Sequence, residues 1–225
     1  MIETKTLRLL PTRPTPLAAA ISLALLAGCS SASGHRLAYE AARSMQDLRG
    51  QLLKLQDRVK AVQSSIETFQ RESRTTPATF ERFRQELDWL ESASLEITSR
   101  ADLSRGQMHE YLTAWEQETN AIQSADLKSR SADRRDLVRA AYLRGEAAHS
   151  AARSALAAFT ASAGDLRAAL GPDLSPAGYE ATREWLEKTR ARGTEAIEAI
   201  AAAAAAFEEQ RRSLLPPAAV DAPAN

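Results

Sequence analysis

The chain has 225 residues, enough for one domain of ordinary size, and carries 29 Lys and Arg against 29 Asp and Glu. This balance gives no global charge that would attract nucleic acid or an anionic membrane, so no nucleic-acid partner is expected. Aromatic residues make up only 5% of the chain and alanine is abundant. That composition favours long, closely packed helices over a β-rich core.

Residues 1–28 have the layout of a secretory signal peptide. A basic stretch precedes an apolar run at 17–27, which at about eleven residues is too short to span a bilayer. The run is followed by Cys29, the only cysteine of the chain, so no disulfide within the chain is possible. Residues 29–34 are rich in serine and are predicted to form a flexible tether. Removal of residues 1–28, with three basic residues and one acidic, would leave a net charge of −2.

The stretch Leu26, Ala27, Gly28 and Cys29 resembles the bacterial lipobox. In lipoproteins that carry it, the cysteine receives a diacylglyceryl group, becomes the N-terminus after cleavage and is then N-acylated. The resemblance implies that Cys29 is lipidated and that several acyl chains hold the protein on a membrane. Because the next residue is Ser30 and not Asp, it also implies the periplasmic face of the outer membrane. The alternative is a buried free thiol that happens to follow an apolar segment.

After the tether, residues 35–212 are predicted to form long helices, because seam residues recur at alternating spacings of three and four. The first stripe consists of Met45, Leu48, Leu52, Leu55, Val59, Val62, Ile66 and Phe69. The second stripe consists of Phe80, Phe83, Leu87, Leu90, Ser94, Ile97, Ala101, Ser104, Met108, Tyr111 and Trp115. Its middle, residues 94–104, is small and polar, so neighbouring helices are expected either to approach closely there or to pack loosely.

Two further stripes follow, both rich in small residues. The third stripe consists of Val138, Ala141, Gly145, Ala148, Ala152, Ala155, Phe159, Ser162, Leu166 and Ala169. The fourth stripe consists of Tyr179, Thr182, Leu186, Thr189, Gly193, Ala196, Ile200, Ala203 and Phe207. Small seam residues favour a short distance between helix axes.

Recognisable signals mark the ends of these helices. Thr76 is predicted to cap the second helix, with Pro77 at its first position. A polar break is expected at 123–131, with Ser131 or Asp133 opening the third helix.

The third helix is expected to end at Gly171 before Pro172, and Ser175 to cap the fourth. Residues 213–225 are predicted to be a disordered Pro/Ala tail. The predicted fold class is all-α, an elongated antiparallel bundle of about four long coiled-coil-like helices.

The chain from Trp115 onward resembles a bacterial family catalogued as domain of unknown function 2959. The residues that carry this resemblance are Trp115, Glu116, Glu118, Leu127, Ser131, Arg139, Tyr142, Leu156, Phe159, Leu166 and Leu170. The resemblance implies an all-helical envelope protein, often with a lipoprotein signal, and it brings no activity and no catalytic residue. The chain departs from the family in the alanine-rich third and fourth helices.

No motif for chemistry stands out. His35, His109 and His149 lie far apart without metal-ligand spacing and are predicted to be solvated. No catalytic, cofactor-binding or metal-ligating residue is predicted, and Cys29 is assigned to the anchor.

Two constellations are candidates for an interaction surface. The first consists of Trp115, Glu116, Glu118, Arg134 and Arg135. It is either a recognition corner at one end of the bundle or ordinary ion pairing beside a seam tryptophan.

The second is Trp185 among basic residues of the fourth helix. It could contact lipid head groups or an anionic polymer. The alternative is a solvated face with one packed ring.

The sequence therefore predicts a non-enzymatic, lipid-anchored periplasmic bundle that acts as a structural or adaptor module. Its expected partners are the membrane and an unknown envelope protein, with self-association through coiled-coil faces as a possibility. One alternative is a membrane-shaping bundle, against which the net charge of −2 argues mildly. Another is a small-ligand carrier or enzyme with its site at 94–104, which would need inward-facing titratable groups.

Overall fold

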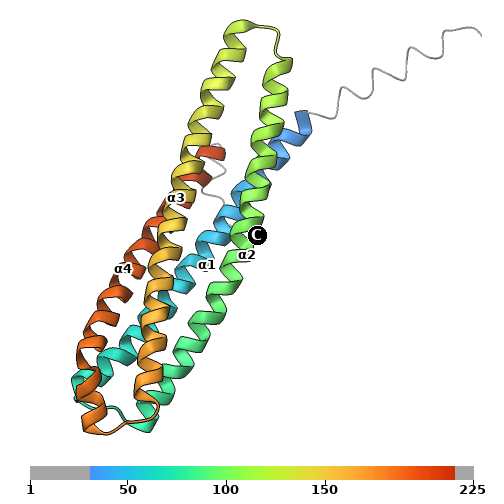
Figure 1. The fold of residues 1–225 in the computed structure, drawn as a ribbon. Helices are drawn as coiled ribbons and strands as arrows, with labels where there is room; N and C mark the ends of the chain where they lie inside the picture. The colour runs from blue at the N-terminus through green and yellow to red at the C-terminus, as the bar shows by residue number, and fades with distance from the viewer. Residues whose placement is uncertain (1–30, 216–225) are drawn as a thin grey trace, which may run out of the picture.

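The computed structural model describes residues 31–215, which form four long helices and no strand within that range. They are α1 (Ser31–Glu72), α2 (Pro77–Ala121), α3 (Ala125–Leu170) and α4 (Pro176–Leu214). Successive helices run in opposite directions along one long axis (Figure 1). The predicted elongated antiparallel bundle is therefore confirmed. None of the described helices is long and apolar enough to cross a membrane.

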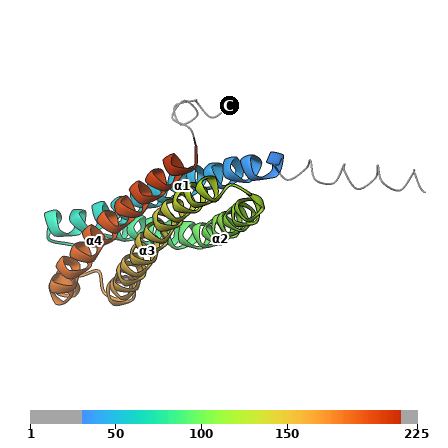
Figure 2. The same ribbon diagram turned by 90° about the horizontal axis from the view of Figure 1, so that it is seen from above.

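Each helix packs against two neighbours, so the four helices form a closed ring around one core (Figures 1 and 2). The close pairs are α3 with α4, α1 with α4, and α1 with α2. The α2–α3 pair is the loosest of the four. The two helices that follow one another through the shortest loop are thus the least tightly packed.

Most of the core comes from the predicted stripes. All eight residues of the first stripe are at most 2% exposed, and all nine of the fourth stripe are buried. Each fully buried Leu, Ile or Phe side chain contributes about 1.5–3 kcal/mol relative to exposure. At the end of the bundle near the α1–α2 loop, Phe69 and Phe83 pack edge to face with ring centroids 5.6 Å apart.

The caps of α2 and α4 form as predicted. Thr76 accepts from the Thr79 backbone N–H, and the Thr79 hydroxyl accepts from the Thr76 backbone N–H, a reciprocal capping box. Ser175 accepts from the Gly178 backbone N–H at 3.3 Å, with Pro176 in the first turn. Each cap satisfies a backbone donor that the first helical turn leaves unpaired.

Two helix ends do not coincide with the predicted domain boundaries. Helix α1 begins at Ser31, so residues 31–34 of the predicted tether are helical. Gly34 lies so close to α2 that an added Cβ would be 2.9 Å from the Glu118 carboxylate. Helix α4 continues to Leu214, so the predicted tail does not begin at Ser213. Cys29, the predicted signal peptide at 1–28 and residues 216–225 lie outside the described residues.

The predicted break at 123–131 was also too long. Ser124, not Ser131 or Asp133, is the cap of α3, and the helix begins at Ala125. Ser131 has another role: its hydroxyl accepts from Trp115 Nε1 at 3.0 Å and lies 2.8 Å from the Thr119 hydroxyl. This polar contact joins the last turns of α2 to the second turn of α3. The polar residues 125–131 are thus part of α3.

Candidate functional site

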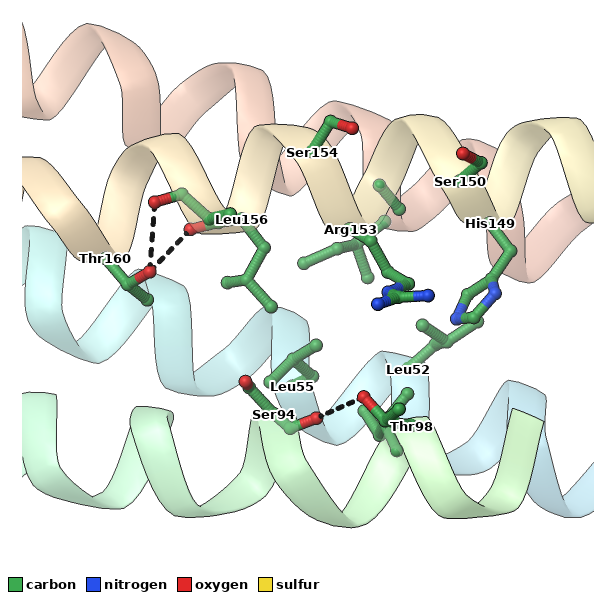
Figure 3. Close-up of a pocket in the computed structure, with 14 residues that line it drawn as sticks. Leu52, Leu55, Ser94, Thr98, His149, Ser150, Arg153, Ser154, Leu156 and Thr160 are labelled. Carbon is green, nitrogen blue, oxygen red and sulfur yellow. Dashed lines mark hydrogen bonds between the residues drawn. The ribbon is translucent and has the colours of Figure 1, made fainter. Parts of the chain in front are cut away.

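A cleft of about 520 Å³ lies between α2 and α3. Leu52 and Leu55 of α1 and Ile200 of α4 form its apolar floor. One wall comes from residues 94–98 of α2 and the other from one face of residues 149–160 of α3 (Figure 3). All four helices therefore contribute to the cleft, which lies at mid-length in the bundle.

Ion pairs join α2 and α3 on either side of the cleft, and none of those in the described residues crosses it. On one side Arg105 of α2 forms an ion pair with Glu146 of α3 at 2.9 Å. On the other side Arg167 of α3 pairs with Asp88 at 2.9 Å and with Glu91 at 3.4 Å. Between these bridges, small residues such as Ser94, Thr98 and Ala152 alternate with larger ones along the two walls. The small, polar middle of the second stripe thus corresponds to loose packing.

Small polar side chains line both walls of the cleft above its floor. Ser94 and Thr98 project from α2 and Thr160 from α3, whereas Ser150 and Ser154 lie at the rim, on the side of α3 away from α2 (Figure 3). The Thr98 and Thr160 hydroxyls donate to carbonyls of their own helices, at 3.3 and 3.1 Å respectively. The cleft therefore combines an apolar floor with hydroxyl-bearing walls.

His149 is the buried titratable residue of the cleft. Its side chain is only 3% exposed, and its Nε2 atom is buried without a hydrogen-bond partner. The ring packs beside Phe207 of α4, with centroids 5.9 Å apart. Burial lowers the pKa of His149 below its ordinary value, which favours the neutral imidazole.

The prediction that His149 is solvated was wrong, whereas His35 and His109 are exposed as expected. The reason is a change in register within α3. The predicted stripe steps from Ala141 by four to Gly145 and then by three to Ala148. In the structure the second step is also four residues, so His149 is buried in place of Ala148, and the next buried residue is Ala152. Such a stutter turns the seam by one position.

From that point the buried face of α3 differs from the predicted stripe. Leu156 and Leu170 are buried, while the predicted Ala155 is half-buried and Ala169 is exposed. The inward-facing titratable group that the ligand-carrier alternative required is therefore present, but it comes from α3 and not from α2.

Arg153 lies one turn after His149, and its guanidinium is beside the imidazole (Figure 3). It is the only formally charged residue of the cleft lining. Among residues 31–215 it has no ion-pair partner, and its charge is felt by His149. The two nearest acidic groups that act on His149, Glu146 and Asp102, are both paired with Arg105.

The predicted corner around Trp115 does form, as a set of contacts between helix ends. Arg135 pairs with Glu116 at 3.3 Å, and Trp115 is half-buried and donates to Ser131. Arg134 donates to the carbonyl of Ser213 in α4. These side chains are used in joining α2, α3 and α4, which matches the expectation of ordinary ion pairing beside a seam tryptophan.

Glu118 and Trp185 complete the predicted interaction residues. Glu118 Oε1 is buried without a partner and faces Gly34 of α1. Trp185 lies near the start of α4, at the opposite end of the bundle from Trp115. Its ring is 44% exposed and is covered in part by Lys188, whose Nζ is 4.6 Å from the ring centroid. The structure therefore does not bring Trp185 together with the other predicted residues.

Comparison with protein-family models, curated proteins and solved structures finds no match. The resemblance to family 2959 therefore stays a prediction. Among residues 31–215, no group of three or more His, Cys, Asp and Glu side chains is arranged to hold a metal ion. The cleft that contains His149 and Arg153 is therefore the candidate ligand-binding site of the described residues.

Proposed function

We propose that the chain is a non-enzymatic spacer or adaptor of the bacterial envelope, anchored through a lipidated Cys29 on the periplasmic face of the outer membrane. The observation that supports this proposal is the position of the two ends of α1. The helix starts two residues after Cys29 and runs 42 residues, about 63 Å at 1.5 Å per residue. The opposite end of the bundle, with the loops at 73–76 and 171–175, would stand that far from the anchor.

The end of the bundle formed by the loops at 73–76 and 171–175 is held together by several local contacts. Thr75 is buried, Thr76 and Thr79 form the capping box, and Phe69 and Phe83 pack beneath them. Asp173 accepts a hydrogen bond from the Ser175 backbone N–H at 2.9 Å in the second loop. A stiff tip at a fixed distance from the membrane suits an adaptor that contacts another envelope protein.

Site-specific photo-crosslinking in intact cells tests this proposal. A photoreactive residue at exposed Arg74, in the α1–α2 loop, is expected to capture a partner protein. The matched position is exposed Glu187, on the side of α4, and is expected to give no product. Equal capture at both positions, or none at Arg74, would contradict an adaptor that works through its tip.

The cleft favours a second candidate function, the carrying of a small ligand. Ligand sites are mostly apolar concave pockets of about 300–1,000 Å³ with a few convergent polar groups. The α2–α3 cleft falls within this size range, its lining mixes apolar and polar side chains, and it holds a buried histidine nitrogen with no partner. Native mass spectrometry of the full-chain Cys29→Ser variant, isolated from cells without detergent, is expected to show a bound small molecule. Protein of bare chain mass under gentle ionisation would contradict this second function.

A further inference from the structure

We infer that the α2–α3 cleft binds a single-chain amphipathic anion, with the acyl chain along the floor and the anionic head between His149 and Arg153. This inference rests on the second candidate function and does not depend on the anchor or on the adaptor role. Its chemical class covers free fatty acids and single-chain phospholipids, which share one acyl chain and one anionic head.

The apolar half of the ligand is indicated by the floor. Leu52, Leu55 and Ile200 come from α1 and α4, which pack closely, and all three are buried, so the floor is preformed. Ile97 and Leu156 add apolar surface from the two walls. From His149 to Thr160 the wall of α3 extends about 16 Å at 1.5 Å per residue. The cleft is therefore long enough for an extended alkyl chain, whose apolar contacts would be Leu52, Leu55, Ile97, Leu156 and Ile200.

The anionic half is indicated by the charges. Arg153 lines the cleft without a carboxylate partner among the described residues, and no acidic residue lines the cleft. Glu146, the nearest acid along α3, is held by Arg105. An anionic head placed beside Arg153 therefore meets one uncompensated positive charge. A hydrogen bond to a charged group contributes more binding free energy than a hydrogen bond between two neutral groups.

His149 Nε2 supplies the second, independent indication of a ligand. A buried polar atom without a hydrogen bond is costly, and native structures rarely leave one unsatisfied. The imidazole lines the cleft, and Arg153 lies one turn further along α3 (Figure 3). Because Nε2 is buried in the ligand-free protein, a head group beside Arg153 reaches this atom once the imidazole rotates about its side-chain bonds. A carboxylate or phosphate oxygen would accept a hydrogen bond from the Nε2–H tautomer.

Isothermal titration calorimetry tests the inference on the full-chain Cys29→Ser variant, which carries no acyl group on residue 29. The probes are decanoate, neutral decanol and lysophosphatidylglycerol. Decanoate, lysophosphatidylglycerol or both are expected to bind, and the pair shows which head group is preferred. Decanol is expected to bind about tenfold more weakly than decanoate, because it lacks the charge that Arg153 recognises.

Three further substitutions locate the site. Arg153→Gln is expected to remove the preference for decanoate over decanol. Ser94→Leu places a larger side chain in the cleft and is expected to abolish binding of all three probes. Its melting temperature should match or exceed that of the parent, because the new side chain fills empty space. Arg139→Gln, an exposed arginine of the same helix outside the cleft, is the control and is expected to change nothing.

The inference is overturned if neither anion binds, if decanol binds as tightly as decanoate, or if folded Ser94→Leu retains binding. Failure here is distinct from failure of the second candidate function. A co-purified molecule of another class in native mass spectra would leave ligand carriage standing while removing the amphipathic anion.

Discussion

Replacement of His149 by leucine is expected to stabilise the ligand-free protein. His149 is only 3% exposed, and its Nε2 atom has no hydrogen-bond partner. Burying an unsatisfied polar group of this kind costs about 1–3 kcal/mol of folding free energy. Leucine has a similar volume and no polar atom, and it would pack against Phe207. We therefore expect His149→Leu to gain about 1–2 kcal/mol. For a domain of this size each 1 kcal/mol moves the melting temperature by about 2–4 °C.

The same substitution is expected to weaken the pH dependence of stability. In the unfolded chain His149 has a pKa of about 6.5. In the folded protein burial lowers it, Arg153 and Arg105 lower it further, and Glu146 and Asp102 oppose them. Between the two pKa values the unfolded state binds more protons, so stability falls as the pH drops from about 6.5 toward the folded value. His149→Leu removes this contribution.

Thermal unfolding of the full chain, followed by circular dichroism from pH 8 to pH 5, measures both effects. His109→Leu is the matched control, because His109 is exposed on α2. A His149→Leu protein that is less stable than the parent at pH 7.5 would refute the reasoning. It would mean that the imidazole makes a stabilising hydrogen bond in the free protein.

Three other predictions concern the core, the surface and the anchor. Gly193→Ala should destabilise by about 1–3 kcal/mol in urea unfolding, because its Cβ would be 2.6–2.8 Å from the buried side chain of Gln63. Glu208→Gln should cost about 1 kcal/mol at neutral pH and flatten acid unfolding. Hydrogen bonds from Arg211 and Arg212 hold the Glu208 pKa at about 2, so its contribution is present above pH 4.5 and is lost as the pH falls toward 2. Cys29→Ala should release the protein from the membrane fraction on immunoblots, and unchanged fractionation would contradict the anchor.

The sequence predicted the parts of the fold that local rules decide. The first stripe from Met45 to Phe69 has unbroken heptad spacing, and every member is buried. The caps at Thr76 and Ser175 also follow from local chemistry, because a hydroxyl before a proline satisfies free backbone donors. These features depend on one helix at a time.

The features that the sequence did not predict depend on two helices together. The stutter that buries His149 follows from the spacing of Ala141, Gly145, His149 and Ala152 only if an eleven-residue step is allowed in place of a heptad. The small, polar stretch at 94–104 allowed either close approach or loose packing. The structure shows loose packing, with ion pairs of Arg105 and Arg167 joining α2 and α3 on either side of the stretch. Their partners are 41 and 79 residues away in the chain, so spacing within one helix does not reveal them.

Photolabelling with a fatty acid that carries a diazirine on its acyl chain tests the cleft most directly. After irradiation of the full-chain Cys29→Ser variant, peptide mass spectrometry locates the modified residues. We expect the label on residues 94–98 of α2 and 149–160 of α3, with competition by unlabelled decanoate. Label spread over the outer helix faces, or label in the cleft that decanoate does not displace, would contradict a binding site between α2 and α3.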